Sequence, residues 1–153
     1  MPEIARLGAK NSGLLRDLNI FFGHAFPDPD ILALKAPSAE SDTAWLANPS
    51  NIGLVAMADE AIVGGLVAYE LVKIEGRREV YLYDLAVDAA FRRQGIATAL
   101  IDELRAIARA SGAWMIFVQA DHGDDEAIAL YTKLGEREDV IHFDIAPHSP
   151  QPK

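Results

Sequence analysis

Apolar residues recur at helical spacing near the start of the chain. They predict a helix over residues 11–24, for which Asn11 or Ser12 supplies the N-cap. The apolar face of this helix collects Leu14, Leu15, Leu18, Phe21 and Phe22. The proline-containing stretch 26–37 predicts a loop, and a second helix follows from Ser38 to about residue 47.

Shorter apolar runs between turn residues predict strands in the first half of the chain. These runs cover residues 3–7, 52–58, 61–71 and 79–87. Tight turns at Asp59-Glu60 and at residues 75–78 separate the last three, which therefore form an antiparallel meander.

Helices and strands alternate in the second half. A strongly amphipathic helix is predicted over residues 95–110, with an apolar stripe of Ile96, Leu100, Ile101, Leu104, Ile107 and Ala108. The continuous apolar run 113–120 predicts a strand buried on both faces. Asp124 or Asp125 caps a further helix that ends at Leu134 before Gly135.

A last strand is predicted over residues 140–145 and a frayed tail over residues 148–153. We find no internal repeat, linker or low-complexity segment in the 153 residues. The pattern therefore predicts one domain over residues 1–147, of mixed α/β class with a central mixed sheet.

The composition excludes several classes of protein. The formal net charge is −9, which argues against nucleic acid as the main partner. The absence of cysteine excludes disulfides and thiolate chemistry, and no metal site is predicted. No apolar run is long enough for a membrane span and no secretory signal is evident, so we expect a cytoplasmic protein.

Acidic residues are concentrated between Ala120 and Asp144. This stretch contains eight acidic residues and two basic residues, Lys133 and Arg137, and so carries a net charge of −6. One interpretation is an ordinary solvated surface. The other is an electric field that attracts a polycationic substrate.

The segment after the meander contains the most informative motif. Residues 92–97 read R-R-Q-G-I-A and fit R-x-x-G-x-A between a strand and a helix. A helix N-terminus has free N–H groups and a partial positive charge, and Gly95 permits close approach of a pyrophosphate. The alternative is a simple turn glycine with two solvated arginines. The P-loop and Rossmann motifs are both missing from the sequence.

With this motif, the whole order of elements resembles the GNAT acetyltransferase superfamily. The resemblance implies a mostly antiparallel sheet splayed at strands 4 and 5, with helices on both faces and acetyl-CoA as co-substrate. It also implies a bulge near residues 85–87 whose backbone binds the pantetheine arm. The cofactor-binding residues so implied are Leu85, Ala86, Val87, Arg92, Arg93, Gln94, Gly95, Ile96, Ala97 and Thr98.

Two residues are candidates for proton transfer. Residues 127–135 are similar to the GNAT A-x-x-L-Y-x-x-x-G helix, in which Tyr131 would protonate the leaving thiolate; otherwise it is a core aromatic residue. The ammonium of the acceptor must lose a proton before it attacks. Asp84, an acid in an apolar strand, is the first candidate base, and pairing with Arg77 or Arg78 is the structural alternative.

Several stretches also resemble the gentamicin 3-N-acetyltransferases almost end to end, among them VAMADEAIVGGLVAYELVK, WMIFVQADHGDD and ALYTKLGEREDVIHFDI. This resemblance implies an aminoglycoside acceptor, direct transfer to the 3-amino group of 2-deoxystreptamine, and antibiotic resistance. The expected substrate-binding residues are Asp121, His122, Asp124, Asp125 and Glu70.

The sequence departs from that pattern at His122, at Glu126 and over residues 31–39. His122 either shapes the range of acceptors or is an ordinary surface residue. Three alternatives therefore stay open: acetylation of another polyamine, small amine or protein amine; an acetyl-CoA sensor without activity; and, for the base, an acid of the 121–125 loop. A homodimer is possible.

Overall fold

The computed structural model describes residues 1–32 and 34–148. The chain divides into two compact units, Met1–Gln119 and Ala120–Lys153. The expectation of one domain over residues 1–147 stays a prediction, and the tail expected at 148–153 lies, apart from His148, outside the described residues. No helix in the described part of the chain is both long and apolar enough to span a bilayer.

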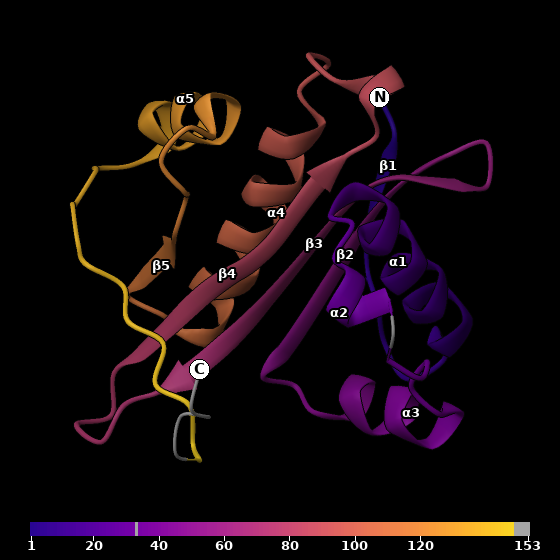
Figure 1. Cartoon of the computed structure of the whole chain (residues 1–153), viewed down its shortest axis with the longest axis horizontal. Helices are drawn as coiled ribbons and strands as arrows, with labels where there is room; N and C mark the ends of the chain where they lie inside the picture. Colours follow the sequence, from indigo (N-terminus) through magenta and orange to yellow (C-terminus); the bar gives the residue numbers. More distant parts are fainter. Residues whose placement is uncertain (33, 149–153) are drawn as a thin grey trace, which may run out of the picture. The chain divides into compact units, whose positions relative to one another are not determined.

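The first unit is built on a five-stranded sheet (Figure 1). Its strands are β1 (Glu3–Arg6), β2 (Asn51–Ala58), β3 (Ala61–Val72), β4 (Arg78–Val87) and β5 (Met115–Val118). They lie side by side in chain order. The first four are antiparallel and β5 runs parallel to β4, which confirms a mixed, mostly antiparallel sheet.

The helices of this unit follow the predicted order with two short additions, α2 (Pro29–Leu32) and the 3-10 helix η1 (Ala89–Phe91). The predicted helices are α1 (Ser12–Ala25), α3 (Ala39–Ala47) and α4 (Ile96–Ser111). The prediction of a loop throughout residues 26–37 is wrong at α2. Proline is tolerated in a first helical turn because its missing N–H has no helical acceptor there, and the Asp28 carboxylate accepts the Asp30 N–H at 2.9 Å.

Two of the predicted helix starts can be checked at their caps. Ser38 caps α3 as predicted, since its hydroxyl accepts the Ser41 N–H at 3.1 Å. Asn11 occupies the N-cap position of α1 but makes no capping hydrogen bond. Its side-chain oxygen accepts the Gly8 N–H at 2.8 Å instead, so it fixes the loop that precedes the helix.

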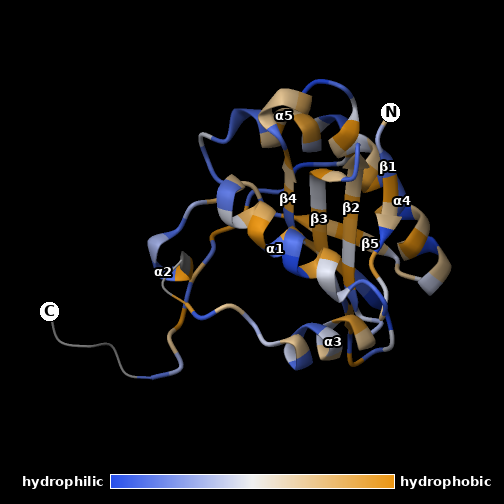
Figure 2. Ribbon diagram, turned by 90° about the vertical axis from the view of Figure 1, so that its right-hand side faces the viewer, coloured by the Kyte–Doolittle hydropathy of each residue, from blue (hydrophilic) through white to orange (hydrophobic). Residues whose placement is uncertain are grey.

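Helices cover both faces of the sheet, as predicted. Two adjacent glycines of β3 show how closely the helices approach the strand. A Cβ built on Gly64 would lie 3.0 Å from Ile96 of α4, whereas one built on Gly65 would clash with Leu18 of α1. Because successive side chains of a strand point to opposite faces, this pair brings α4 against one face of β3 and α1 against the other. Figure 2 shows the apolar strands β2, β3 and β4 beside α1.

The core lies between the sheet and these helices. The stripe predicted on α4 is buried at Ile96, Leu100, Ile101, Leu104 and Ala108. On the other face, Leu18 of α1 packs with Leu7, Val55 and Val67. Strand β4 packs between these two layers and leads into both candidate sites described below.

Strand β5 differs from its prediction. It covers four residues rather than 113–120, and none of the four is fully buried. The reason is its place at the sheet edge, where β4 is its one partner among the described strands. Its pairing with β4 ends at Leu82 and Val118, whereas β4 continues to Val87, so the two strands part there as the splayed sheet requires.

The second unit contains one described helix, α5 (Asp125–Leu134). Asp124 caps it, as predicted, by accepting the Ala127 N–H at 3.2 Å. The strand predicted over residues 140–145 is wrong: these residues are exposed and form no regular secondary structure. Their alternating apolar pattern suits a strand, but a strand needs a partner edge, and within this unit no other strand is described.

Candidate active site

The loop from β4 to α4 is anchored at both ends. The Asp88 N–H donates to the Val63 carbonyl of β3 at 2.8 Å, and the Asp88 carboxylate accepts the Ala90 N–H at 2.8 Å. At the other end Ile96, the first residue of α4, is buried. The intervening residues 92–95 are exposed. The loop is therefore a fixed turn with an accessible outer surface.

Gly95 gives this turn its shape. It is the N-cap of α4 and has a φ of 81°, in the left-handed region that favours glycine. A Cβ built there has only Met1 Cε within 4 Å, at 3.8 Å, so the approach is open. The N–H groups of Ile96, Ala97 and Thr98 belong to the first helical turn and have no intrahelical acceptor. The turn thus presents several N–H donors and the positive end of the helix dipole to an anion.

The two predicted arginines flank these donors. Arg93 is exposed and has a φ of 61°, which turns the backbone sharply before Gly95. Arg92 Nε lies 3.4 Å from the carbonyl oxygen of Val87, so its guanidinium lies back against the end of β4. Two cationic side chains, a glycine and a helix N-terminus together fit a diphosphate.

Leu85, Ala86 and Val87 follow the point at which β5 leaves β4. On one side they pair in regular register with Leu66, Gly65 and Gly64 of β3. On the other side the β5 pairing has already ended. Within the first unit, the described residues therefore leave this edge of β4 without a strand partner, as the binding of an extended pantetheine arm requires.

The bulge itself lies earlier than predicted. Val67 pairs with Asp84 and Ala68 with Leu82, so Tyr83 is the extra residue of β4. The predicted bulge is therefore present in β4 but lies two residues before residues 85–87, which themselves keep their register. An extra residue at Tyr83 re-aims the side chains around it, which is a common role of bulges next to functional sites.

Asp84 follows this bulge and is half-buried. Desolvation by burial raises the pKa of its carboxyl. No hydrogen-bond or ion-pair partner of Asp84 lies among the described residues, and pairing with Arg77 or Arg78 is not what the structure shows. Arg77 pairs with Glu75 and Arg78 with Glu70. A half-buried carboxylate without a partner is a good candidate for a general base.

Aromatic side chains surround Asp84 on the α1 face. Tyr69 and Tyr83 meet edge to face with centroids 6.0 Å apart, and Tyr83 lies 5.2 Å from Tyr81. We call the contiguous rings of Trp45, Tyr69, Tyr83, Tyr81 and Phe117 the aromatic row. The Tyr81 hydroxyl also donates to the Gln119 side-chain oxygen at 2.9 Å.

Sequence reasoning missed the aromatic row. A signal was present in Y-L-Y-D at residues 81–84, where two tyrosines at strand spacing precede the acid. The bulge could not be foreseen from that spacing, and it is the bulge that brings Tyr83 and Asp84 to one face.

Glu70 lies elsewhere. Its side chain forms an ion pair with Arg78 and lines a hollow of about 390 Å³ together with Ile107, Ala110 and Ser111 of α4. This hollow is on the α4 face of the sheet, whereas Asp84 pairs with Val67, which packs with Leu18 of α1. The structure therefore places these two predicted acids on opposite faces.

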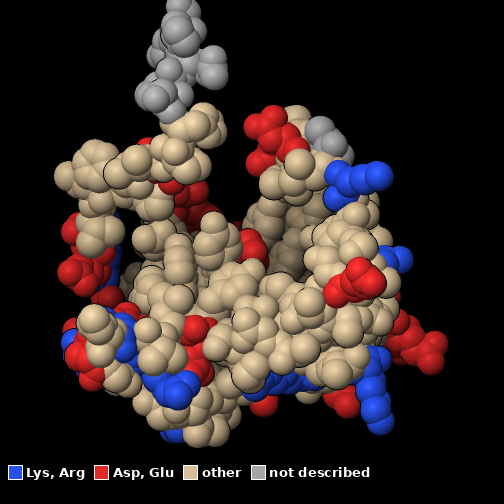
Figure 3. Space-filling view, turned by 90° about the horizontal axis from the view of Figure 1, so that it is seen from below, with Lys and Arg blue, Asp and Glu red and all other residues tan. Residues whose placement is uncertain are grey.

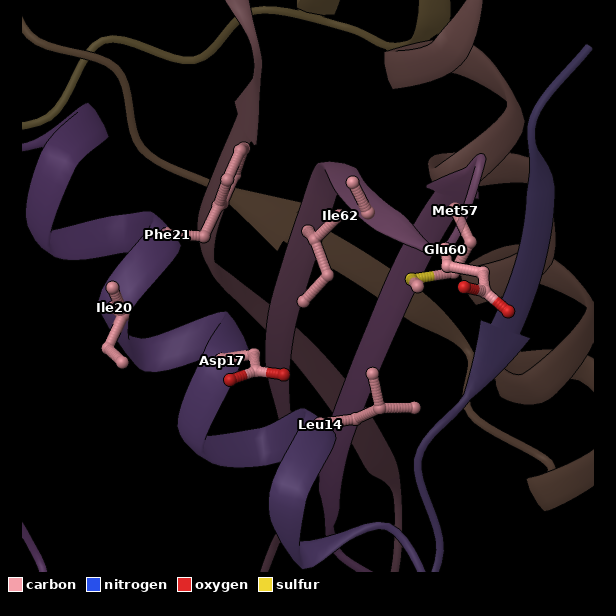
Figure 4. Close-up of a pocket in the computed structure, with 8 residues that line it drawn as sticks. Leu14, Asp17, Ile20, Phe21, Met57, Glu60 and Ile62 are labelled. Carbon is pink, nitrogen blue, oxygen red and sulfur yellow. The ribbon is translucent and has the colours of Figure 1, made fainter.

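A second hollow, of about 280 Å³, lies between α1 and the β2–β3 hairpin (Figure 4). It is lined by Leu14, Asp17, Ile20, Phe21, Met57, Glu60, Ala61 and Ile62. None of these is a predicted site residue. On the face seen in Figure 3, acidic and basic side chains are intermingled along the margins.

The remaining candidates belong to the second unit. Asp121, His122, Asp124 and Asp125 are exposed before and at the start of α5. Of these, Asp124 already caps the helix. Tyr131 is partly buried; desolvation, with the nearby charge of Asp124, raises the pKa of its hydroxyl. The phenol is therefore protonated at neutral pH and can donate a proton.

The fold agrees with what is found by comparison with known proteins. Residues 15–135 match the family model described as the acetyltransferase (GNAT) family. A comparison with curated protein sequences found no significant match.

Solved structures extend the likeness over almost the whole chain. An aminoglycoside acetyltransferase, HMB0005, from an uncultured soil metagenomic sample has 44% identity and a TM-score of 0.91, covering 97% of this chain and 99% of that one. Another from such a sample, meta-AAC0020 in complex with sisomicin, has 30% identity and a TM-score of 0.86, covering 95% and 96%. The CoA complex of aminoglycoside N-acetyltransferase AAC(6')-Iy, at 18% identity and a TM-score of 0.73, covers 95% of each chain and shows the fold alone.

Proposed function

Because the chain belongs to the GNAT acetyltransferase family, and so uses acetyl-CoA to transfer acetyl groups, we propose that its acceptor is an aminoglycoside. We assign the transfer to the 3-amino group of the 2-deoxystreptamine ring. The observation that supports an aminoglycoside best is the 44% identity, over 97% of this chain, to an aminoglycoside acetyltransferase. The sisomicin complex of a second relative, at 30% identity, supports the same class.

The turn at Gly95 binds the diphosphate of the co-substrate in this proposal. The N–H groups of Ile96 and Ala97 donate to phosphate oxygens, and Arg93 contributes positive charge. The free edge of β4 at residues 85–87 holds the pantetheine arm in an extended form. Acetyl-CoA supplies the thioester whose acetyl group is transferred.

Asp84 serves as the general base. The acceptor binds as an ammonium ion, and its nitrogen acquires a lone pair once the Asp84 carboxylate has taken a proton, directly or through one water. The amine nitrogen then forms a bond to the acetyl carbon while the carbon–sulfur bond breaks, and the acylated nitrogen loses its second proton to water to give the neutral amide. Burial favours this step, because a carboxylate with a raised pKa is a stronger base than one in water.

Tyr131 serves as the general acid. The sulfur leaves as a thiolate, and the phenol hydroxyl of Tyr131 donates a proton to it. The raised pKa of Tyr131 keeps that proton in place at neutral pH until the thiolate forms. Without cysteine in the chain, a covalent acyl-cysteine intermediate is impossible, so the acetyl group passes directly to the amine.

The charge distribution suits a polycationic acceptor. Residues 120–153 contain eight acidic and three basic residues, so the second unit carries more than half of the net charge of −9. Asp121, His122 and Asp125 are exposed there and are proposed to bind ammonium and hydroxyl groups of the antibiotic. Modification of such drugs would make a susceptible bacterium resistant.

A thiol-release assay tests this function. We expect acetyl-CoA to be consumed with sisomicin, gentamicin and kanamycin, but not with spermidine or a peptide with a free N-terminus. Mass spectrometry and NMR of the product should locate one acetyl group on the 3-amino nitrogen. An acetyl group at the 6' position would contradict the site of transfer, and turnover of spermidine or peptide alone would contradict the aminoglycoside assignment.

A further inference from the structure

Tyr83 combines properties that its neighbours lack. Tyr83 is 61% exposed, yet its ring contacts two other rings, Tyr69 at 6.0 Å and Tyr81 at 5.2 Å between centroids. These rings are themselves held. Tyr69 meets Trp45 edge to face at 6.3 Å, and Tyr81 stacks on Phe117 at 4.6 Å. An exposed tyrosine packed between two other rings has fewer accessible rotamers than an isolated one, so it presents a largely pre-formed aromatic surface.

The bulge of β4 accounts for this placement. Tyr83 has no partner residue on β3, and the next residue, Asp84, pairs with Val67. The charge of Asp84 reaches both rings that flank Tyr83: it contributes to the raised pKa of the Tyr69 hydroxyl and of the Tyr81 hydroxyl, after desolvation as the main cause. The aromatic row and the carboxylate therefore lie within one small region of the sheet face.

An aromatic face beside a carboxylate suits one kind of ligand. The ring quadrupole attracts a cation above its face, and the negative charge of Asp84 adds to the attraction. A monoamine would use the carboxylate alone. A molecule with several ammonium groups can place one at Asp84 and another over the ring.

We propose that Tyr83 is a specificity-determining residue that binds a second ammonium group of the acceptor while Asp84 receives the amine to be acetylated. This inference rests on the proposed function for the role of Asp84. It narrows the substrate class to compounds with at least two ammonium groups within the reach of both side chains. The other rings of the aromatic row support the ring of Tyr83 from both sides.

Isothermal titration of the protein with sisomicin and with spermidine tests the proposal. Tyr83→Leu should raise the Kd for both ligands by about 2- to 30-fold, the range expected for loss of a cation–π contact. Tyr83→Phe, which keeps the ring, should stay within about twofold of the parent. Trp114→Leu is a matched control, because Trp114 is also exposed, at 52%, but contacts Arg77.

The ligand pair separates ammonium from sugar recognition, because spermidine has ammonium groups and no sugar ring. Weaker sisomicin binding without any effect on spermidine, or with no spermidine binding at all, would overturn the proposal in favour of stacking on the sugar. An unchanged Kd for sisomicin would overturn it as well. Thermal melting checks folding, and Tyr83→Thr, which suits a strand, replaces Tyr83→Leu if that variant is unstable.

Titration also separates this inference from the proposed function. If the parent protein binds sisomicin through Tyr83 but releases no thiol from acetyl-CoA with it, the transfer to aminoglycosides fails and the ammonium site stands. If thiol release proceeds normally in Tyr83→Leu with an unchanged KM, the function stands and the ammonium site fails.

Discussion

The proposed cofactor turn at residues 92–98 and the proposed acceptor face around Asp84 are built in different ways. Asp84 lies within β4, three residues before its end at Val87, and the turn follows that end. The turn offers backbone N–H groups, which any sequence could supply once Gly95 allows the left-handed geometry. The acceptor face offers side chains: a carboxylate and a row of rings that a bulge brings together.

This difference indicates which of the two sites can accept amino-acid substitutions. A backbone-built site tolerates many side chains but depends strongly on one conformation, so it leaves a short, recognisable motif. A side-chain-built site can be altered residue by residue while the sheet stays intact. We therefore expect substitutions in the turn to affect acetyl-CoA whatever the acceptor, and substitutions on the acceptor face to affect the amine.

The largest effect is expected at Asp84. Asp84→Asn removes the proposed base and should lower kcat by about 100- to 10,000-fold, with little change in acetyl-CoA affinity. In the parent, kcat/KM should fall as the pH drops through the raised pKa of Asp84, since the carboxylate must be ionised to accept a proton. Thiol-release rates across pH measure both. An unchanged rate would move the base to an acid of the 121–125 loop.

Thermal melting separates that loss from damage to the fold. Because burial raises the pKa of Asp84, its contribution to stability is present below the ordinary value of 3.8 and is lost as the pH rises through the raised value. Asp84→Asn should therefore melt at the same or a higher temperature than the parent at pH 7, and this difference should vanish near pH 3. A lower melting temperature at pH 7 would indicate a structural role.

The next effect is expected at Gly95. Gly95→Ala places a Cβ at a φ of 81°, next to the proposed position of the diphosphate, and should weaken acetyl-CoA binding by roughly tenfold or more. Gly112→Ala is the matched control, since Gly112 has the same φ of 81° at the other end of α4 and no atom within 4 Å of a built Cβ. It should lose comparable stability and keep its affinity. Titration with CoA and thermal melting decide; equal affinity losses would refute the placement of the diphosphate.

The smallest effect on catalysis is expected at Glu70, the acid on the opposite face. Glu70→Gln breaks the ion pair with Arg78 and should cost about 1 kcal/mol of stability, a fall of about 2–4 °C in Tm, with kcat and KM within about twofold of the parent. Differential scanning calorimetry and thiol-release kinetics measure these values. A large rise in KM for aminoglycosides would restore Glu70 to the substrate site and remove the distinction between the two faces.

Much of the fold follows from local pattern. The stripe of α4 and the caps Ser38 and Asp124 are as predicted, because periodicity and capping depend on neighbouring residues alone. The Asp59-Glu60 turn is also as predicted, with both residues at positive φ. Likewise the mixed GNAT sheet was implied by the order of elements and by the motif at residues 92–97.

The rest depended on long-range pairing. Residues 140–145 alternate like a strand, yet alternation does not supply a partner edge. The continuous apolar run at β5 suggested burial on both faces, but the place of a strand in a sheet is set by topology rather than by its own sequence. The bulge at Tyr83 came two residues earlier than expected, because register is fixed by the packing of β3 against both helices.

The paired glycines of β3 make the sheet unusually sensitive to substitution by a larger residue. Gly64 lies against Ile96, the first residue of the helix whose N-terminus forms the cofactor turn. A single methyl group introduced there, within the sheet and away from any ligand, would press on the base of that helix. Variation at this interior position would therefore change how firmly the proposed cofactor turn holds acetyl-CoA, while the proposed acceptor face keeps its shape.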